Sequence, residues 1–409
     1  MTARAPSDRD GRLRIIVLGY VVRGPLGGMA WHHLQYAMGL RRLGHDVYFL
    51  EDSGDDASCC YDPERNVTDS RPDYGLAFAG AVFPRIGMAD RWAYHDAHGT
   101  GWRGPSGGRA EELAASADLV LNLSGINLIR PWLADVPRRA LVDTDPVFTQ
   151  VRHLTEPDRL ELANRHTSFH TFAENIGRPG CTIPDDGLPW SPTRQPVVLE
   201  AWPVTPAPQD GPFTTVMQWD SYPAREYDGR RYGLKSDSFA SIIDLAGRTE
   251  AVFELAVGAP GPIRKRLAAH GWRVQDPRPP TLDPWTYQRF IQRSRAEFSV
   301  AKDAYVSTRS GWFSERSAAY LASGRPVLVQ ETGFSDWLPP GPGVVPFTNV
   351  EEAVAGVAEL AGDYPAHARA ARAVAEESFD ARTVLPRLLA DAMDGPTADI
   401  RASLRRVGS

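Results

Sequence analysis

The stretch that most constrains the fold is residues 298–334, FSVAKDAYVSTRSGWFSERSAAYLASGRPVLVQETGF. Its β-branched and aromatic runs end in small polar residues, whereas its middle has the apolar spacing of a helix. Gly324 suits the left-handed residue that follows a helix, and Pro326 prevents the helix from continuing. The stretch therefore predicts two short strands that flank one helix, with residues 307–314 as the loop before the helix.

The loop and the first turn of that helix form a candidate phosphate site. We expect the helix to begin near Ser314 or Glu315, with Ser314 as its N-cap. Exposed backbone N–H groups and the positive end of the helix dipole favour an anion at such a position. The residues that we assign to phosphate binding here are Ser310, Gly311 and Ser314.

The small-residue loop, the helix with an acidic residue and the following A-S-G-x-P-V resemble the donor-nucleotide site of GT-B glycosyltransferases, particularly the family 4 group. In that family, two glutamates eight positions apart bind the donor sugar and the ribose. Here Gly311 and Ala319 take their places. Glu315 lies one helical turn before Ala319 on the same face, so it is the acidic residue that can reach a ribose or sugar hydroxyl.

The amino-terminal segment GGMAWHHLQYAMGLRRLGHDV is similar to the first loop and helix of the same family. The glycine pair of that family lets the backbone approach the donor diphosphate, so the resemblance implies this role for Gly27 and Gly28. A lysine before the first helix of the second domain neutralises the donor phosphates in these enzymes, and Lys235 stands where it is expected. Because a departing diphosphate needs fixed positive charge, the alternatives for the same work are Arg230, Arg231 and Arg309.

The first 50 residues also allow a dinucleotide site, because a strand at 13–19, a glycine-rich turn, a helix at 29–43 and a strand at 46–50 are expected there. A dinucleotide site requires the spacing G-x-G-x-x-G. The glycines at 19, 24, 27 and 28 do not match it, which disfavours a nicotinamide-dependent oxidoreductase. Glu51 after the second strand could hold a ribose, and the alternative is an acidic residue in a solvated loop.

Four residues are candidate catalytic groups. His32 and His33 lie early on the first helix, where either could act as a general base or bind a sugar hydroxyl, or simply pack in the core. Asp143 and Asp145 end a strand as D-T-D-P. A D-x-D can chelate a divalent metal, as in GT-A enzymes. Since the resemblance is to an enzyme with two nucleotide-binding halves, we favour a metal-free carboxylate, with strand-end capping as the structural alternative.

The chain is longer than one ordinary domain, with 409 residues, and residues 203–212 are rich in proline. We expect an α/β protein with the GT-B fold, in which two Rossmann-like domains face a cleft. The expected parts are an acceptor domain at 1–205, a nucleotide-sugar donor domain at 206–385, and a helix and tail at 386–409 that cross back to the first domain.

The charge of the chain limits the expected binding partners, and its cysteine content limits the expected compartment. The net charge is −6 and the basic residues are scattered, so neither nucleic acid nor anionic lipid is an expected partner. Three cysteines do not form a disulfide framework, and neither an apolar leader nor an integral membrane segment is recognised. We therefore expect a cytoplasmic protein.

These observations predict a bacterial, metal-independent glycosyltransferase without a cofactor other than its co-substrate. It would move a sugar from a nucleoside-diphosphate sugar to a hydroxyl or amine of a small natural-product-like or glycan acceptor. A sugar-nucleotide epimerase of the same fold and a non-catalytic nucleotide-binding partner of another transferase are the alternatives. The donor sugar and base, the acceptor, the stereochemical outcome and the oligomeric state, with a homodimer as one option, are left open.

Overall fold

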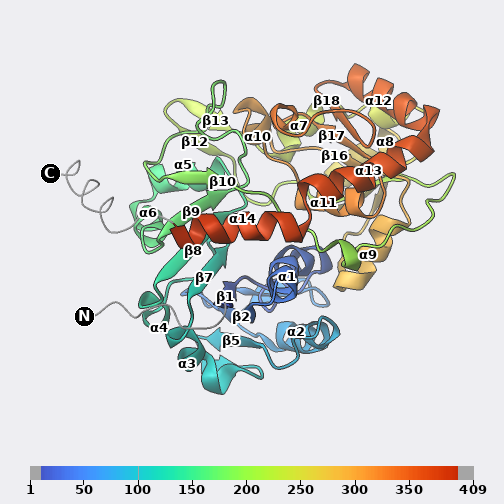
Figure 1. Cartoon of the computed structure of the whole chain (residues 1–409). Coiled ribbons are helices and arrows are strands. Elements are labelled where there is room, and N and C mark those ends of the chain that lie inside the picture. The colour runs from blue at the N-terminus through green and yellow to red at the C-terminus, as the bar shows by residue number, and fades with distance from the viewer. Residues whose placement is uncertain (1–10, 100, 395–409) are drawn as a thin grey trace.

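The computed structural model describes residues 11–99 and 101–394, which form two α/β domains, each built on a mainly parallel sheet (Figure 1). The part of the predicted tail beyond residue 394 lies outside the described residues. The carboxyl ends of both sheets point toward the interface between the domains, since residues that follow β8 and β16 meet there.

The first sheet has the order β10-β9-β8-β7-β1-β2-β5-β6, with only β6 antiparallel to its neighbour. Its central strand β1 is fully apolar after its first residue and pairs with β2 on one side and β7 on the other, as in a Rossmann fold. The strands are β1 (Arg14–Leu18), β2 (Asp46–Asp52), β5 (Trp92–Asp96), β6 (Gly101–Arg103), β7 (Leu119–Leu123), β8 (Arg138–Asp143), β9 (Ser168–Thr171) and β10 (Trp190–Pro192). The helices are α1 (Gly27–Arg42), α2 (Asp73–Arg85), α3 (Ala110–Ala115), α4 (Pro131–Ala134), α5 (Phe148–Thr155) and α6 (Pro157–Ala163).

The second sheet is wholly parallel, with the order β15-β14-β11-β16-β17-β18. Its strands are β11 (Phe213–Gln218), β14 (Phe253–Gly258), β15 (Arg273–Gln275), β16 (Ala296–Ser299), β17 (Val327–Gln330) and β18 (Val344–Phe347). The helices around it are α7 (Lys235–Ala240), α8 (Gly261–Ala269), α9 (Pro284–Gln292), α10 (Asp303–Ser307), α11 (Glu315–Ala322), α12 (Val350–Gly362) and α13 (Tyr364–Ser378).

The last described helix, α14 (Ala381–Asp394), returns to the first domain, as predicted from the resemblance (Figure 1). It packs against α1, β8 and β9. Its apolar side joins the core of the first domain through Leu385, Leu388 and Leu389. One continuous chain therefore links the end of the second domain to the core of the first.

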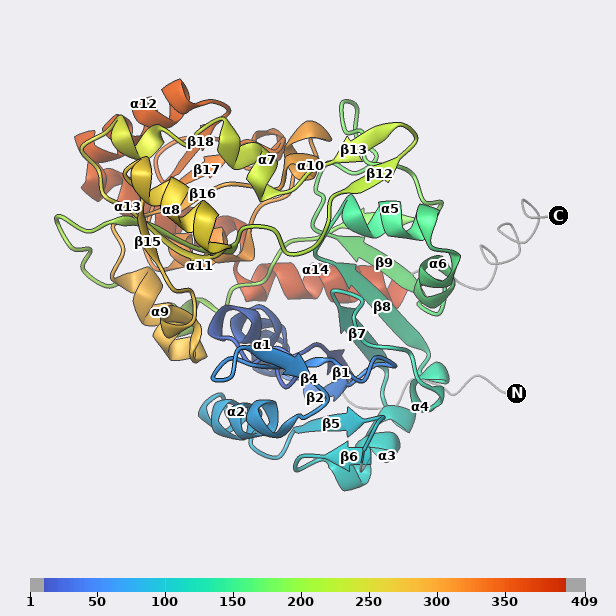
Figure 2. The same cartoon turned by 180° about the vertical axis from the view of Figure 1, so that it is seen from behind.

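Two small antiparallel hairpins stand outside the main sheets: β3 (Cys60–Asp62) with β4 (Val67–Asp69), and β12 (Arg225–Tyr227) with β13 (Arg230–Tyr232). The β12–β13 hairpin belongs to the second domain but lies over α5 of the first (Figure 2). Arg225 is ion-paired with Glu156, and Arg230 Nη1 donates to Thr182 Oγ1 at 3.0 Å. The hairpin is therefore a second bridge between the domains.

The unit at residues 298–334 has the predicted helix and second strand. Ser314 is the N-cap of α11 and accepts a hydrogen bond from the Arg316 amide, and Gly324 has a φ of +68° after the helix. The expectation of extended chain up to the loop is wrong for residues 303–307, which form α10. This helix is only five residues long, and its sequence DAYVS carries no helical repeat that a pattern search could detect.

Candidate functional site

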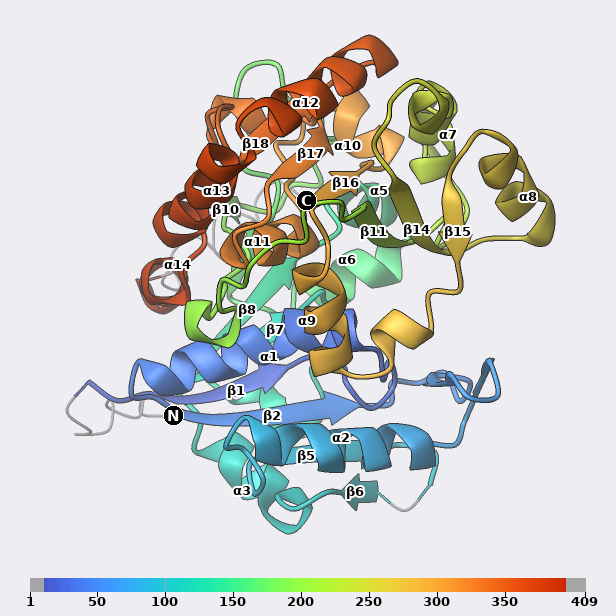
Figure 3. The same ribbon diagram turned by 90° about the vertical axis from the view of Figure 1, so that its right-hand side faces the viewer.

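The glycine pair at the start of α1 allows a close approach between the two domains, where α9 lies beside α1 (Figure 3). A Cβ atom on Gly27 would lie 2.2 Å from the carbonyl oxygen of Asp283, and one on Gly28 would lie 3.2 Å from the Tyr287 ring. Trp31 Nε1 donates to the carbonyl of Pro284 at 2.6 Å. The neighbour that requires the small residues is thus α9, and a contact of this pair with a diphosphate stays a prediction.

The loop between β1 and α1 is held by a buried carboxylate. Glu51 is 1% exposed and accepts hydrogen bonds from the backbone amides of Val21, Val22 and Arg23 at 2.6–2.8 Å. Neither of the two roles expected for Glu51, a ribose ligand or a solvated loop residue, describes this position. A carboxylate that is fully committed to three amides fixes the loop that precedes α1.

The two candidate histidines differ in their surroundings. His33 is fully buried, its Nδ1 lies 2.8 Å from the carbonyl oxygen of Met29, and its ring meets Tyr20 edge to face. Burial holds its pKa well below the usual value, so it is a packing residue in its present position. Burial also lowers the pKa of His32, but the negative charge of Glu315, from the second domain, opposes that shift. His32 is therefore the histidine whose shift includes a charge from the second domain, whereas the causes given for His33 lie within the first.

The two candidate aspartates also separate. Asp143 accepts hydrogen bonds from Thr149 Oγ1 at 2.7 Å, Thr171 Oγ1 at 2.9 Å and the Asp145 amide at 2.9 Å. Burial raises its pKa. These contacts are those of a carboxylate that ties strand ends together, which is the structural alternative stated for it.

Asp145 reaches across the interface instead. Its Oδ1 lies 2.6 Å from the ammonium of Lys302, and the hydroxyls of Tyr222 and Tyr305 also donate to its carboxylate. The Lys302 charge and the hydrogen bonds keep its pKa below the usual value although burial alone would raise it. The two carboxylates of the D-T-D sequence thus belong to separate hydrogen-bond networks, and they do not lie side by side as they would to chelate one metal ion. Within 11–99 and 101–394 no cluster of three metal-ligating side chains occurs.

Lys235 is the most distinctive donor-site candidate. It is the first residue of α7 and is partly buried, and no hydrogen bond or ion pair with another described residue engages its ammonium group. Burial and the positive charges of Arg316 and Lys302 lower the pKa of Lys235 to about 7. The charges of Glu315 and Glu297 oppose this shift without reversing it. An amine that has no direct ion pair and feels two other cations is suited to receive an anion from outside the chain.

The loop before α11 is less accessible to a phosphate than predicted. Ser310 is fully buried and donates to the carbonyl of Tyr305, and Gly311, with a φ of +75°, lies against the Asn175 side chain. Asn175 Nδ2 in turn donates to the carbonyl of Gly333 at 2.8 Å. Ser310 and Gly311 are therefore part of a contact between the domains.

The remaining predicted donor residues lie on either side of that contact. Arg309 is half exposed and pairs with Asp336 at 3.0 Å, so its charge is already matched. Ser314 caps α11, and Glu315 makes no hydrogen bond to any described residue while its charge acts on His32 and Lys235. Lys235, Ser314 and Glu315 are thus the donor candidates that the structure brings together.

Arg316 is a buried cation that the sequence reasoning missed. Its guanidinium donates to Glu297 Oε1 at 2.6 Å, to Ser299 Oγ at 2.7 Å and to the carbonyl of Val216 at 3.0 Å. These contacts anchor the first turn of α11 to the carboxyl ends of β16 and β11. In the sequence, a buried arginine within a helix looks the same as an arginine that is exposed to solvent. Only the folded structure therefore shows that Arg316 is buried.

A cavity of about 980 Å³ opens in the first domain, along the carboxyl ends of β2, β7 and β8. Its wall includes Arg23, Asp55, Asp56, Cys59, Asn127, Asp143, Arg152, His153, Glu156, Asp158, Arg159 and His166. The position at the strand ends beside the central strand is where open α/β sheets bind ligands.

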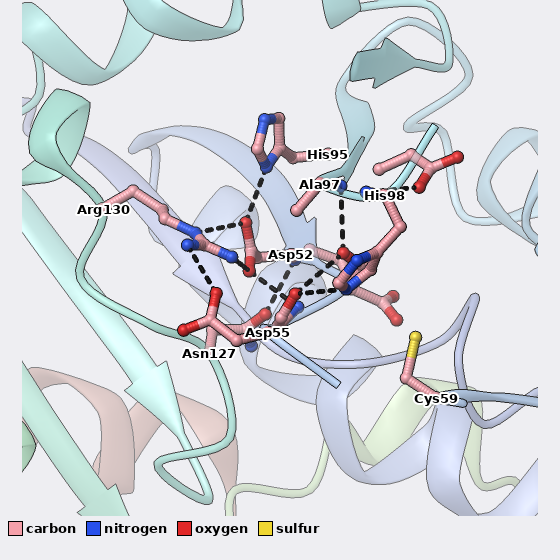
Figure 4. A network of polar contacts seen from close by, with 12 residues as sticks. Asp52, Asp55, Cys59, His95, Ala97, His98, Asn127 and Arg130 are labelled. Atoms are coloured by element: carbon pink, nitrogen blue, oxygen red, sulfur yellow. Dashed lines mark hydrogen bonds and ion pairs between the residues drawn. The ribbon is translucent and has the colours of Figure 1, made fainter. Parts of the chain in front are cut away.

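One side of this cavity is stiffened by an ionic network (Figure 4). Asp52 is 1% exposed and accepts from Arg130 Nε at 3.0 Å and Nη2 at 2.9 Å, while His95 Nδ1 lies 2.7 Å from it. Arg130 also pairs with Asp55 of the cavity wall at 2.8 Å. Two hydrogen bonds from one guanidinium to a buried carboxylate hold the arginine side chain in one position, so this wall of the cavity is preformed.

Comparison with known proteins gives the fold. No family model and no curated protein sequence matches the chain. Among solved structures, an alpha-glucosyltransferase in complex with UDP and a 13-mer DNA containing an HMU base is 9% identical, with a TM-score of 0.58 over 94% of this chain and 100% of that one. AviGT4, a glycosyltransferase involved in avilamycin A biosynthesis, is 14% identical, with a TM-score of 0.55 over 94% and 99%.

A glycosyltransferase from Rickettsia africae is 10% identical, with a TM-score of 0.52 over 94% of this chain and 98% of that one. The likeness extends over nearly the whole of both chains in all three cases, so the chain has the GT-B fold, as predicted. Since one neighbour was solved with DNA, the exclusion of nucleic acid stays a prediction. Among the described helices, none combines the length and the apolar character that crossing a membrane would take.

Proposed function

We propose that this GT-B chain transfers a sugar from a nucleoside-diphosphate sugar to a hydroxyl or amine of a small-molecule or glycan acceptor. The observation that carries the proposal is Lys235, a partly buried lysine at the start of α7 whose ammonium group has no hydrogen bond or ion pair with a described residue. A donor diphosphate would supply the missing negative charge, and it would return the ammonium to its charged form as it binds.

On the donor side, Lys235 acts together with the first turn of α11. Lys302 and Arg316 are paired with Asp145 and Glu297, but their charges still act on Lys235, and the amides behind Ser314 add the positive end of a helix dipole. Fixed cations stabilise the charge that develops on a departing diphosphate. We therefore assign the stabilisation of the departing diphosphate to side chains rather than to a metal. We assign to Glu315 a hydrogen bond with a hydroxyl of the ribose or the sugar.

On the acceptor side, we assign the acceptor to the cavity of the first domain, whose lining residues all belong to that domain. Asp143 is part of its wall, and Asp145, two residues later, contacts Lys302, whose charge acts on Lys235. An acceptor in the cavity would thus lie next to the donor half. Duplex nucleic acid is a poor fit to a wall that carries several carboxylates, so we propose a small natural-product-like or glycan acceptor.

Of the four catalytic candidates, His32 has the best position to act on an acceptor hydroxyl. Its neighbour Glu315 comes from the donor half, whereas His33 and Asp143 are committed to contacts within the first domain. Asp145 is committed to Lys302. We therefore propose His32 as the residue that contacts the reacting groups. We propose that His33, Asp143 and Asp145 instead hold the surrounding structure in place.

A thermal-shift series with UDP, dTDP, GDP, ADP and NADH tests the proposal, because a ligand that binds only the folded state raises the melting temperature. We expect one nucleoside diphosphate to stabilise the protein, and Lys235→Met to remove that shift. Lys265→Met is the matched control, since Lys265 is an exposed lysine of α8. Stabilisation by NADH alone would overturn the proposal, and conversion of the donor without any acceptor would favour an epimerase.

A further inference from the structure

A histidine of the cavity wall, His153, is paired with a buried aspartate behind it, and neither residue has a role in the donor half. His153 lies on α5, which the β12–β13 hairpin covers (Figure 2), and its side chain is 7% exposed. Its Nδ1 lies 2.7 Å from Oδ2 of Asp186, whose side chain has no exposed surface. Trp190 stacks on the imidazole with its ring 6.2 Å away and 11° from parallel.

The contacts of Asp186 decide which nitrogen of His153 carries the proton. Asp186 Oδ1 accepts from Trp190 Nε1 at 2.9 Å and from the Leu188 amide at 3.1 Å. With N–H donors already on one oxygen, the carboxylate acts as an acceptor on the other oxygen as well. Nδ1 of His153 is therefore the donor, and Nε2 is the nitrogen that is left for a partner from outside the chain.

A second histidine of the same wall shows the contrast. Nε2 of His166 accepts from Asn122 Nδ2 at 3.0 Å, and its Nδ1 donates to the carbonyl of Ala163 at 2.9 Å, so both ring nitrogens are used. Burial lowers the pKa of His166 to about 4, which keeps it neutral. For His153, by comparison, no hydrogen bond from any described residue reaches Nε2, although the residue lines the cavity.

We propose that Nε2 of His153 recognises a hydroxyl group of the molecule bound in this cavity, and that Asp186 is the residue that positions it. The inference rests on the proposed function, because the bound molecule is the acceptor of the transfer. An unpartnered ring nitrogen on a cavity wall calls for a hydrogen-bonding group of the ligand, and a hydroxyl can serve it in either form of the ring because it both donates and accepts hydrogen bonds.

The charges of the wall narrow the class of ligand to neutral, polyhydroxylated ring compounds. Arg159 is paired with Glu156, and Arg23 is paired with Glu51 behind the wall. Asp56, Asp158 and Arg152 have no ion pair with a described residue, so the unpaired charges of the wall are of mixed sign, and one lone arginine rather than a cluster of cations is left for an anionic ligand. The volume of about 980 Å³ is enough for several sugar-sized rings.

Binding of maltotriose, a neutral polyhydroxylated probe, measured by saturation-transfer difference NMR, tests the inference. We expect a signal with the wild-type protein, a loss of at least tenfold in apparent affinity in His153→Phe, and partial recovery in His153→Gln, whose amide oxygen can accept a hydrogen bond. His270→Phe is the matched control, because His270 pairs with Asp244 on the second domain. It should bind as the wild type does.

A positioning role of Asp186 has its own readout. In the protein labelled with ¹⁵N histidine, Asp186→Asn should change the tautomer of His153 and leave that of His166 as it is. Equal maltotriose binding in His153→Phe and the wild type, or no binding in either, would overturn the inference. The thermal shift with a nucleoside diphosphate reports separately on the proposed function, since the donor half is intact in all of these variants.

Discussion

The carboxylate of Asp145, at the end of β8 in the first domain, lies 2.6 Å from the ammonium of Lys302 in the second domain. The pair is mostly removed from solvent, with side chains 24% and 14% exposed, and the hydroxyls of Tyr222 and Tyr305 complete it. This ion pair joins the two sheets at the ends of their strands. It therefore helps to fix how the ends of the two sheets are placed relative to each other.

Asp145→Asn should loosen this junction. Removing one partner leaves the Lys302 charge poorly matched, and the expected loss of stability is roughly 1–3 kcal/mol, between the values for exposed and for buried pairs. Chemical denaturation measures it, and small-angle scattering should show a larger radius of gyration. Glu351→Gln is the control, because the Glu351–Arg248 pair is exposed and its loss should be almost neutral.

The effect of Asp145→Asn should also depend on pH. Because the pKa of Asp145 is lower in the folded protein than the ordinary value of 3.8, the carboxylate stabilises the fold above about pH 4. That contribution is lost as the pH falls through the folded pKa. The stability difference between the wild type and the variant should therefore shrink below about pH 4, and a constant difference down to pH 3 would contradict this assignment.

Nucleotide binding should take up a proton at Lys235. The pKa of its amine is about 7 in the free protein, and a bound diphosphate raises it by favouring the charged form. Calorimetry at pH 8 in buffers of different ionisation enthalpy should show this uptake, and affinity should fall as the pH rises from 7 to 9. Lys235→Met should bind about 10- to 100-fold more weakly, the size of one charge-assisted hydrogen bond, and without the pH dependence.

Much of the fold follows from local sequence signals. The apolar run of β1, the Ser314 cap and the stop at Gly324 and Pro326 each depend on residues adjacent in the chain. Their physical causes are short-range, so they can be read from a single sequence. The two-domain GT-B arrangement came instead from resemblance, carried by two motifs at opposite ends of the chain.

The site is harder to predict because its contacts join distant segments. Asp143 and Asp145 stand two residues apart, yet one caps a strand and the other binds Lys302, 157 positions further on. Gly27 suggests a phosphate by its motif, but the nearest group is the carbonyl of Asp283. Nothing near His153 in the sequence indicates that Asp186 will hold it, since α6 and β9 lie between them in the chain. Such pairings exist only once the fold has formed.

Gly27→Ala should push the two domains apart. The added Cβ would lie 2.2 Å from a backbone oxygen of α9's N-cap residue, Asp283, which cannot rotate away, so we expect a loss of roughly 1–3 kcal/mol or more. Gly28→Ala is the matched control. Its Cβ would lie 3.2 Å from the ring of Tyr287, which can shift, and its cost should be less than half as large. Thermal unfolding compares the two, and equal costs would contradict the close approach at Gly27.

Cys59 should be the cysteine that reacts first with iodoacetamide. Its thiol is part of the cavity wall (Figure 4) and lies 3.6 Å from the sulfur of Cys60, and a hydrogen bond from Cys60 lowers the pKa of Cys59 to about 7. The same contact raises the pKa of Cys60, and burial raises that of Cys181. Because the thiolate is the nucleophile, the rate of alkylation at Cys59 should rise with a midpoint near pH 7.

Peptide mapping by mass spectrometry after a short exposure at pH 7.5 checks this order. We expect label at Cys59 and little at the other two thiols, and Cys59→Ser should remove most of the total label. The added amide would stand in the cavity of the first domain, so the labelled protein should bind maltotriose more weakly yet keep its thermal shift with a nucleoside diphosphate. Faster labelling of Cys181 than of Cys59, or an equal loss of both binding activities, would show that the thiol and the cavity are not related as the structure places them.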